Sequence, residues 1–178
     1  LRFDKHIRLM QAHMGLRPGT RVLDIGCGTG ALLVELATAG AEVTGIDTFE
    51  EAGGLDLEIA RARLREQGLG ADIRSGTAAA LPFPDDSFDL AVNIGMLEHL
   101  PPELRRSVLP EMLRVVRPGG SLFLIAGPTA ATPLDQHVPG HYFANWLSRE
   151  RKIEICQRAG RRQFLDIPWG ISRAGSRS

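Results

Sequence analysis

The feature that most constrains this 178-residue chain is a short apolar run ending in a cluster of glycines, Val22–Gly30 (VLDIGCGTG). Apolar residues around Asp24 indicate a buried strand, and the glycines let the backbone turn sharply and approach a ligand closely. Ala31–Ala37 then has leucines at helical spacing. A strand, a glycine turn and a helix N-terminus with free N–H groups together predict a nucleotide-binding turn. An ordinary strand-to-helix connection would explain only one of the three glycines.

Asp24 narrows the choice of ligand. The pattern Gly26-x-Gly28-x-x-Ala31 also fits the turn that binds nicotinamide dinucleotides, whose strand usually has an apolar residue at the position of Asp24. An acid at this position can accept hydrogen bonds from an ammonium group. The predicted ligand therefore carries an amino acid as well as a nucleoside, which is the shape of S-adenosylmethionine.

Four later motifs follow this turn in a fixed order. They are an acid, Asp47, at the end of a predicted strand, then LPF at 81–83, LEH at 97–99 and RPGG at 117–120. In this order the five motifs resemble class I S-adenosylmethionine-dependent methyltransferases, of the methyltransferase type 11 kind. The resemblance implies S-adenosylmethionine as cofactor and S-adenosylhomocysteine as its product. It implies an α/β fold: a doubly wound, mainly parallel Rossmann-like sheet with helices on both faces, strand order 3-2-1-4-5 and a short or trimmed C-terminal closing strand.

The same resemblance assigns cofactor-binding residues. Asp47, at the tip of the second strand, is expected to reach the ribose hydroxyls. Capping the following helix is the alternative role, and the two roles can coexist. Thr77 stands where the family usually has an acid that binds the adenine amino group, and the N–H of Ala78 can still serve adenine N1. Asn93 and Ile94 end the fourth strand, close to the expected sulfonium. The complete predicted set is Asp24, Gly26, Cys27, Gly28, Asp47, Thr48, Thr77, Ala78, Asn93 and Ile94.

Three histidines are candidates for a general base. Methyl transfer from a sulfonium mainly requires alignment, but a hydroxyl acceptor benefits from a base. We predict His99 in the LEH motif, and His137 and His141 in the loop Gly127–His141, which we expect to cover the acceptor. The alternatives left open are a packing or capping role for His99 and solvent exposure of the two loop histidines. No metal site is predicted, because no third patterned ligand accompanies the loop histidines.

Composition limits the expected partners and compartment. The formal net charge is zero, which disfavours a general attraction to nucleic acid. No apolar run reaches transmembrane length, and two cysteines make no disulfide framework. We therefore expect a cytoplasmic protein without nucleic-acid or membrane partners, acting on a small-molecule or glycan-type acceptor.

The chain is expected to be one domain over residues 1–178. Its predicted parts are an N-terminal helix in 1–19, a cofactor-binding core in 20–127, and an acceptor loop, last helix and tail in 128–178. The end has room for one good closing strand, Gln163–Ile167, so either the sheet is trimmed or a homodimer partner completes its edge. A start at Leu1 fits a fragment of a longer product.

Three boundaries are predicted in less regular stretches. A helix is expected over Asp56–Gln67. Another is expected over Glu103–Val116, kinked or split in two by Pro110. The RPGG motif is expected to be the exit from that helix, before a buried strand over Ser121–Ala126.

Two other function classes remain open from the sequence. A degenerate, non-catalytic S-adenosylmethionine-binding protein is favoured by Thr77 and by the short C-terminus, since each weakens a standard part of the site. A nicotinamide-dependent oxidoreductase shares the glycine turn, but Asp24 and the five ordered motifs argue against it.

Overall fold

A computed structural model of the chain describes residues 3–50, 54–100, 102–125, 154 and 158. The chain divides into two compact units, Leu1–Ile94 with Pro102–Ile125 and Gly95–Pro101 with Ala126–Ser178. The expected closing strand, the acceptor loop, His137 and His141 all lie outside the described residues. The assignment of 1–178 to one domain stays a prediction.

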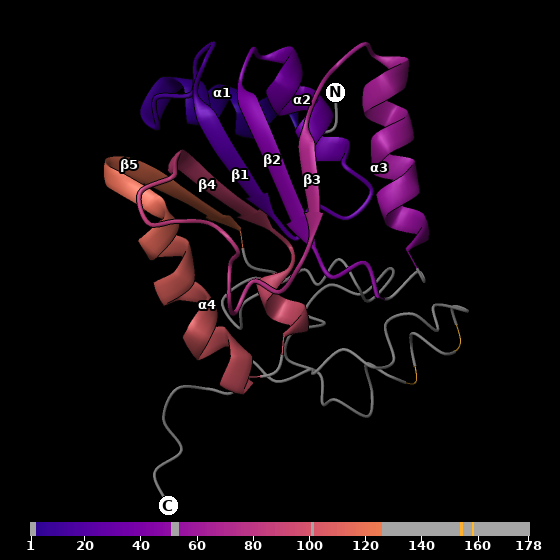
Figure 1. The fold of residues 1–178 in the computed structure, drawn as a ribbon, viewed down its shortest axis with the longest axis vertical. Helices are drawn as coiled ribbons and strands as arrows, with labels where there is room; N and C mark the ends of the chain where they lie inside the picture. The colour runs from indigo at the N-terminus through magenta and orange to yellow at the C-terminus, as the bar shows by residue number, and fades with distance from the viewer. Residues whose placement is uncertain (1–2, 51–53, 101, 126–153, 155–157, 159–178) are drawn as a thin grey trace, which may run out of the picture. The chain divides into compact units, whose positions relative to one another are not determined.

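The first unit is built on a parallel sheet of five strands in the order β3-β2-β1-β4-β5 (Figure 1). This confirms the predicted 3-2-1-4-5 order. All five carboxyl ends therefore meet at one edge of the sheet, the edge at which open α/β folds bind ligands. The strands are β1 Arg21–Ile25, β2 Glu42–Asp47, β3 Asp72–Ser75, β4 Phe88–Ile94 and β5 Val116–Ile125.

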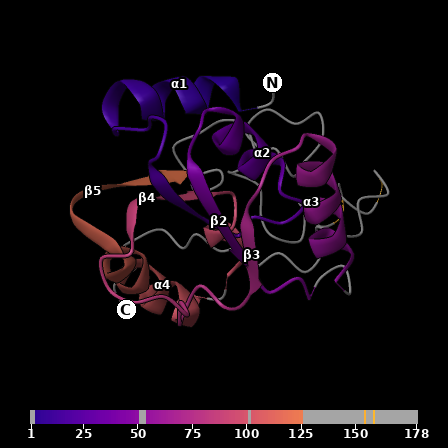
Figure 2. The ribbon, with the colours of Figure 1, turned by 45° about the horizontal axis from the view of Figure 1, so that its top comes forward.

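Helices cover both faces of this sheet, as expected. α1 (Asp4–His13), α2 (Ala31–Thr38) and α3 (Leu55–Glu66) lie side by side on one face, with α2 in the middle. α4 (Pro102–Val115) packs against β4 and β5 on the other face (Figure 2). The second unit contributes a short 3₁₀ helix, η1 (Leu97–His99). None of the described helices is long and apolar enough to cross a bilayer.

The core follows from the apolar pattern of the central strand and the first crossover helix. Val22, Leu23 and Ile25 of β1 are fully buried, as expected for a parallel strand covered on both faces. Leu33 and Leu36 of α2 pack onto that strand layer and are also fully buried. The glycine turn therefore joins two elements that are anchored in the core, and these anchor both ends of its backbone.

Of the two effects expected of Pro110, a kink or a split, the split of the fourth helix into two is wrong. α4 runs unbroken from Pro102 to Val115, although Pro110 cannot donate the N–H bond that a helical residue makes to the preceding turn. Val108, Met112 and Val115 share one face of α4 and are fully buried, so packing on the sheet offsets the lost bond. The helix predicted over Asp56–Gln67 is confirmed with its bounds moved by one residue.

The RPGG segment is part of a strand and not a helix exit, which corrects the boundary predicted at Ser121. β5 begins at Val116, which pairs with Phe88, and its register then shifts so that Ser121 pairs with Leu90. Gly120 permits this bulge, since a β-carbon there would lie 2.7 Å from the carbonyl oxygen of Asp89.

Asp89 holds the amino-terminal edge of the sheet together. Its carboxylate accepts from the N–H of Arg21 at 2.9 Å, from Nη2 of Arg21 at 3.2 Å and from Nε of Arg117 at 2.6 Å. One acid thus ties the starts of β1 and β4 to the bulge in β5. The hydrogen bonds from Arg21, the larger cause, and from Arg117 hold the pKa of Asp89 well below its usual range.

We predict that Asp89→Ala lowers the free energy of unfolding at pH 7 by about 1–2 kcal/mol, below the full range for bonds to charged groups because water screens both arginines. A carboxyl pKa that is lowered on folding contributes stability above its unfolded value, and that stability is lost as pH falls through the folded value. Urea unfolding at pH 7 and at pH 3 should therefore show a smaller difference between the two proteins in acid. An equal difference at both values would contradict this account.

Candidate functional site

The glycine turn after β1 folds back over the end of β2. The N–H groups of Gly26 and Cys27 both donate to the carbonyl of Ile46, at 2.8 and 3.2 Å. Gly26 and Gly28 have φ values of 80° and 47°, in the left-handed region that glycine adopts without strain. The turn is thus held by β2, and its other side lies at the ligand-binding edge of the sheet.

The carboxylate of Asp47 fixes the turn from the tip of β2. Oδ2 accepts from the N–H of Gly28 at 2.9 Å, and Oδ1 accepts from the N–H of Phe49 at 3.2 Å. The residue before α3 is Gly54, and no side chain caps that helix. The alternative role of Asp47, capping the following helix, is therefore wrong. Each carboxylate oxygen keeps lone pairs for a further donor, such as a hydroxyl of a ligand.

Close packing dictates the small residues around the turn. A β-carbon on Gly30 would lie 2.9 Å from Cβ of Ala60, so α3 presses directly on the turn. A β-carbon on Gly45 would lie 2.9 Å from Sγ of Cys27. Cys27 is buried, and burial, followed by the nearby acids, raises the pKa of its thiol. Its role is therefore to fill space under the turn and not to react.

Asp24 and Asn93 bring buried acceptors to the same edge. Asp24 is 3% exposed, and burial, followed by the charge of Asp47, raises the pKa of its carboxyl to about 7. Asn93 is fully buried on β4; its Nδ2 donates to the carbonyl of Ile25 at 2.7 Å, while its Oδ1 has no hydrogen-bond partner among the described residues.

A buried acceptor without a donor is rare, so the Oδ1 of Asn93 calls for a partner. A carboxylate on β1 and an amide oxygen on the adjacent β4 together suit a ligand that carries a positively charged N–H donor. The residues present therefore fit the amino-acid end of S-adenosylmethionine.

The segment expected to border adenine is anchored to Asp47. The N–H of Gly76 donates to the backbone carbonyl of Asp47 at 2.9 Å. Thr77 is exposed, and its hydroxyl accepts from the N–H of Ala79 at 3.2 Å. Within the described part of the chain the N–H of Ala78 has no acceptor, so it remains free to donate to a base.

The other predicted residues are less closely engaged. Thr48 is exposed, and its carbonyl accepts from the hydroxyl of Ser75 at 3.3 Å. Ile94 is half-buried at the end of β4. His99 ends η1, where its N–H donates to the carbonyl of Met96 at 2.9 Å. Because η1 belongs to the second unit, the prediction that His99 faces the acceptor stays a prediction.

Phe49 is a structural residue of the site that sequence inspection missed. Its side chain is 6% exposed and packs into the core, yet its φ is 57°. A bulky side chain in the left-handed region is strained, and such strain persists only where surrounding contacts enforce it. Its N–H bond to Asp47 and its buried ring supply those contacts. The loop after β2 therefore begins as a fixed structure beside the glycine turn.

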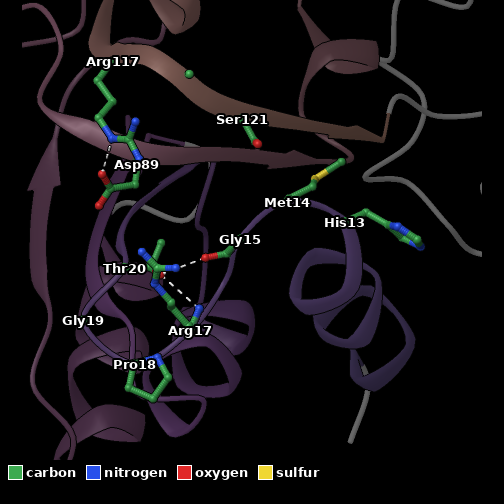
Figure 3. A pocket seen from close by; sticks show the side chains of 11 residues that line it. His13, Met14, Gly15, Arg17, Pro18, Gly19, Thr20, Asp89, Arg117 and Ser121 are labelled. Atoms are coloured by element: carbon green, nitrogen blue, oxygen red, sulfur yellow. Dashed lines mark hydrogen bonds and ion pairs between the residues drawn. The ribbon is translucent and has the colours of Figure 1, made fainter.

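A polar cavity of about 520 Å³ lies at the opposite, amino-terminal edge of the sheet (Figure 3). Its walls come from the connection between α1 and β1 and from the starts of β4 and β5. The lining side chains include His13, Arg17, Thr20, Asp89, Arg117 and Ser121. None of the predicted cofactor-binding residues lines this cavity, so it is separate from the site at the carboxyl edge.

Comparison with solved structures supports the fold of the first unit. A structure described as SAM-dependent methyltransferases from Methanosarcina mazei is 33% identical, with a TM-score of 0.57, and the match covers 64% of this chain and 54% of that one. The [4+2]-cyclase SpnF is 29% identical with a TM-score of 0.60, covering 88% of this chain and 57% of that one.

The sequence comparisons agree with this result. A ubiquinone biosynthesis O-methyltransferase from Stutzerimonas stutzeri is 40% identical over 121 residues, which are 67% of this chain and 46% of the relative. The chain thus spans about half the length of this curated relative. A family model described as a methyltransferase domain matches residues 22–120, from the glycine turn to the bulge in β5. The chain therefore belongs to the class I S-adenosylmethionine-dependent methyltransferases.

Proposed function

We propose that this chain methylates a hydroxyl group of a small molecule, with S-adenosylmethionine as the methyl donor. The observation that carries the proposal is the convergence at one sheet edge of the buried Asp24 carboxylate, the unpartnered Oδ1 of Asn93 and the glycine turn held by Asp47. The relative named as an O-methyltransferase supports oxygen as the acceptor atom. A glycan-type acceptor and a homodimer stay predictions from the sequence alone.

In this proposal, different residues bind different parts of the cofactor. When bound, S-adenosylmethionine supplies an electrophilic methyl carbon, to which the acceptor oxygen bonds as the carbon–sulfur bond breaks and S-adenosylhomocysteine leaves. Asp24 and Asn93 accept hydrogen bonds from the ammonium group of the ligand. Asp47 accepts from the ribose hydroxyls, and the N–H of Ala78 donates to adenine N1. Fixing one reactant in this way supplies much of the rate of a displacement reaction, because the acceptor then meets the methyl group in line.

A non-catalytic cofactor-binding protein is the second candidate. It is favoured by Thr77, whose hydroxyl is already bonded to Ala79 and brings no charge to the adenine amino group. One solved structure similar to this chain is named a [4+2]-cyclase and not a methyltransferase. The fold alone therefore does not establish methyl transfer.

Calorimetry followed by an acceptor screen distinguishes these functions. The purified chain is titrated with S-adenosylmethionine, S-adenosylhomocysteine and NADH, and is then incubated with phenols, catechols and sugars while product S-adenosylhomocysteine is measured. Binding with methylation of a hydroxyl supports the proposal. Binding without turnover on any acceptor supports the non-catalytic alternative, and binding of NADH in place of the two sulfur ligands supports an oxidoreductase.

We predict that Asp47→Ala weakens the binding of S-adenosylhomocysteine by about 1.5–3 kcal/mol, the range for hydrogen bonds to a charged group. Asp72→Ala is the matched control, since Asp72 is an exposed acid at the start of β3 that binds Arg74. Calorimetry of both variants measures the change. If folded Asp47→Ala and Asp72→Ala bind S-adenosylhomocysteine with equal affinity, Asp47 does not bind the ribose.

A second prediction concerns pH. Because the pKa of Asp24 is about 7, the carboxylate that accepts from the ligand's ammonium group is lost in acid. Affinity for S-adenosylhomocysteine should therefore fall about tenfold for each pH unit below 7. Asp24→Asn should bind weakly at every pH and show no such dependence.

The stability of the unliganded protein gives an independent check on Asp24. A carboxyl pKa raised on folding means that the folded state holds a proton between about pH 4 and 7 that the unfolded state has released, so stability falls as pH rises through that window. Thermal unfolding of unliganded Asp24→Asn should accordingly show a gain over the original protein at pH 8 that disappears near pH 4. If the two proteins differ in thermal stability by the same amount at pH 8 and at pH 4, folding does not raise the pKa of Asp24.

His99, His137 and His141 are proposed as the groups that take the acceptor proton. Replacing the true base by alanine should lower turnover by about 10²- to 10⁴-fold, the usual contribution of general base catalysis. Affinity for S-adenosylhomocysteine should change little, since the proposed cofactor contacts come from other residues. Turnover that is unchanged in all three single variants would show that none of these histidines is the general base.

A further inference from the structure

Arg114 connects α4 to the loop that leads from β3 to β4. Its Nη1 donates to the carbonyl of Phe83 at 2.8 Å, and its Nη2 donates to the carbonyl of Leu81 at 3.0 Å. Its other N–H groups bind carboxylates: Nε and Nη2 reach Glu111 and Nη1 reaches Asp85, each at 2.8 Å. A guanidinium has five N–H donors, and these five bonds use them all.

Glu111, one turn earlier on α4, completes the attachment. Its Oε2 accepts from the N–H of Leu81 at 2.7 Å, so both backbone polar groups of Leu81 are bound to α4. The hydrogen bond from Arg114, as the main cause, lowers the pKa of Glu111 to about 2. The pair therefore stays charged at physiological pH. In the reverse direction, the N–H of Asp86 donates to the backbone carbonyl of Arg114 at 3.0 Å.

Apolar packing holds the same end of the loop. Leu81 and Phe83 are 5% and 8% exposed. The ring of Phe83 meets that of Phe88 edge-on, with 5.1 Å between centroids, and the guanidinium of Arg74 lies 4.9 Å from the Phe83 centroid. The end of the loop is therefore fixed by an ion pair on one side and by the sheet on the other.

The turn at Thr77 and Ala78 lies between this attachment and the bond from Gly76 to Asp47. Its own described bonds are short-range: Ala79 N–H to the Thr77 hydroxyl at 3.2 Å and Ala80 N–H to the Thr77 carbonyl at 3.3 Å. Local bonds set the shape of such a turn but not its place in the molecule. Its place therefore depends on what holds the two ends of the loop.

We propose that Arg114 and Glu111 are positioning residues for adenine recognition. They act through the backbone of Leu81 and Phe83, and thereby hold the N–H of Ala78 where it can donate to adenine N1. The inference rests on the proposed function, because it takes the bound base to be the adenine of S-adenosylmethionine. A lysine cannot replace Arg114, since a single ammonium lacks the planar fork that reaches two carbonyls and two carboxylates together.

The test compares two ligands that differ only in the base. S-inosylhomocysteine has a protonated N1, which cannot accept from the N–H of Ala78, so the intact protein should prefer S-adenosylhomocysteine. In Arg114→Lys, affinity for S-adenosylhomocysteine should fall about tenfold, the loss of one well-placed hydrogen bond. The preference between the two ligands should fall with it. Calorimetry gives both affinities, and thermal unfolding is recorded for each variant.

Arg117→Lys is the matched control, because Arg117 is also a partly exposed arginine that binds an acid, Asp89, at the opposite edge. It should lower stability and leave the preference unchanged. If Arg114→Lys does not fold, Glu111→Gln is the second variant. It keeps a side-chain acceptor for the N–H of Leu81. It should therefore lower the preference for S-adenosylhomocysteine over S-inosylhomocysteine by a smaller factor.

The outcomes separate this inference from the proposed function. Failure of the original protein to bind S-adenosylhomocysteine would overturn the proposed function itself. If the original protein binds and discriminates, and the folded variants keep the same preference while melting at lower temperature, Arg114 and Glu111 are structural only and the inference is wrong. A reduced preference in the variants alone, with the control unchanged, supports it.

Discussion

The return of the glycine turn onto the end of β2 is the constraint on which the rest of the carboxyl edge depends. Two N–H groups converge on the carbonyl of Ile46, and a third binds the carboxylate of Asp47. These bonds fix the turn before any ligand arrives, so less ordering remains when one binds. They also bring Asp47 beside the buried Asp24, and the repulsion between the two acids contributes to the raised pKa of Asp24. The site thus combines a rigid backbone with an electrostatic environment that favours a cation.

The order of the elements could be predicted from the sequence because the signals were local. Apolar strands, a glycine turn and an acid at the end of β2 each reflect the pattern of a few neighbouring residues. The strand order followed from the resemblance of five motifs. The same local signals located Asp24, Asp47 and Asn93, since each lies at or next to the carboxyl end of a strand.

The errors and omissions came from tertiary contacts that no local sequence pattern reveals. Pro110 stays inside one helix because the buried face of α4 outweighs the missing bond, and that face is defined only by the sheet beneath it. Phe49 takes a left-handed backbone because Asp47 and the core hold it there. The bonds from Arg114 to Leu81 and Phe83 cross more than 30 residues, and no short motif reveals such a partnership. Propensity is a weak guide wherever tertiary contacts of this kind decide the outcome.

The ion cluster around Asp89 has a consequence for how this domain can change. The cluster lies at the starts of the strands and the glycine turn lies at their ends, and a strand of five residues spans roughly 17 Å. Effects of substitutions at sites this far apart usually add without coupling. Evolution can therefore adjust the heat and acid tolerance of the fold at one edge while selection on ligand affinity acts at the other. A lineage that moves to a harsher environment need not rebuild its binding site to survive there.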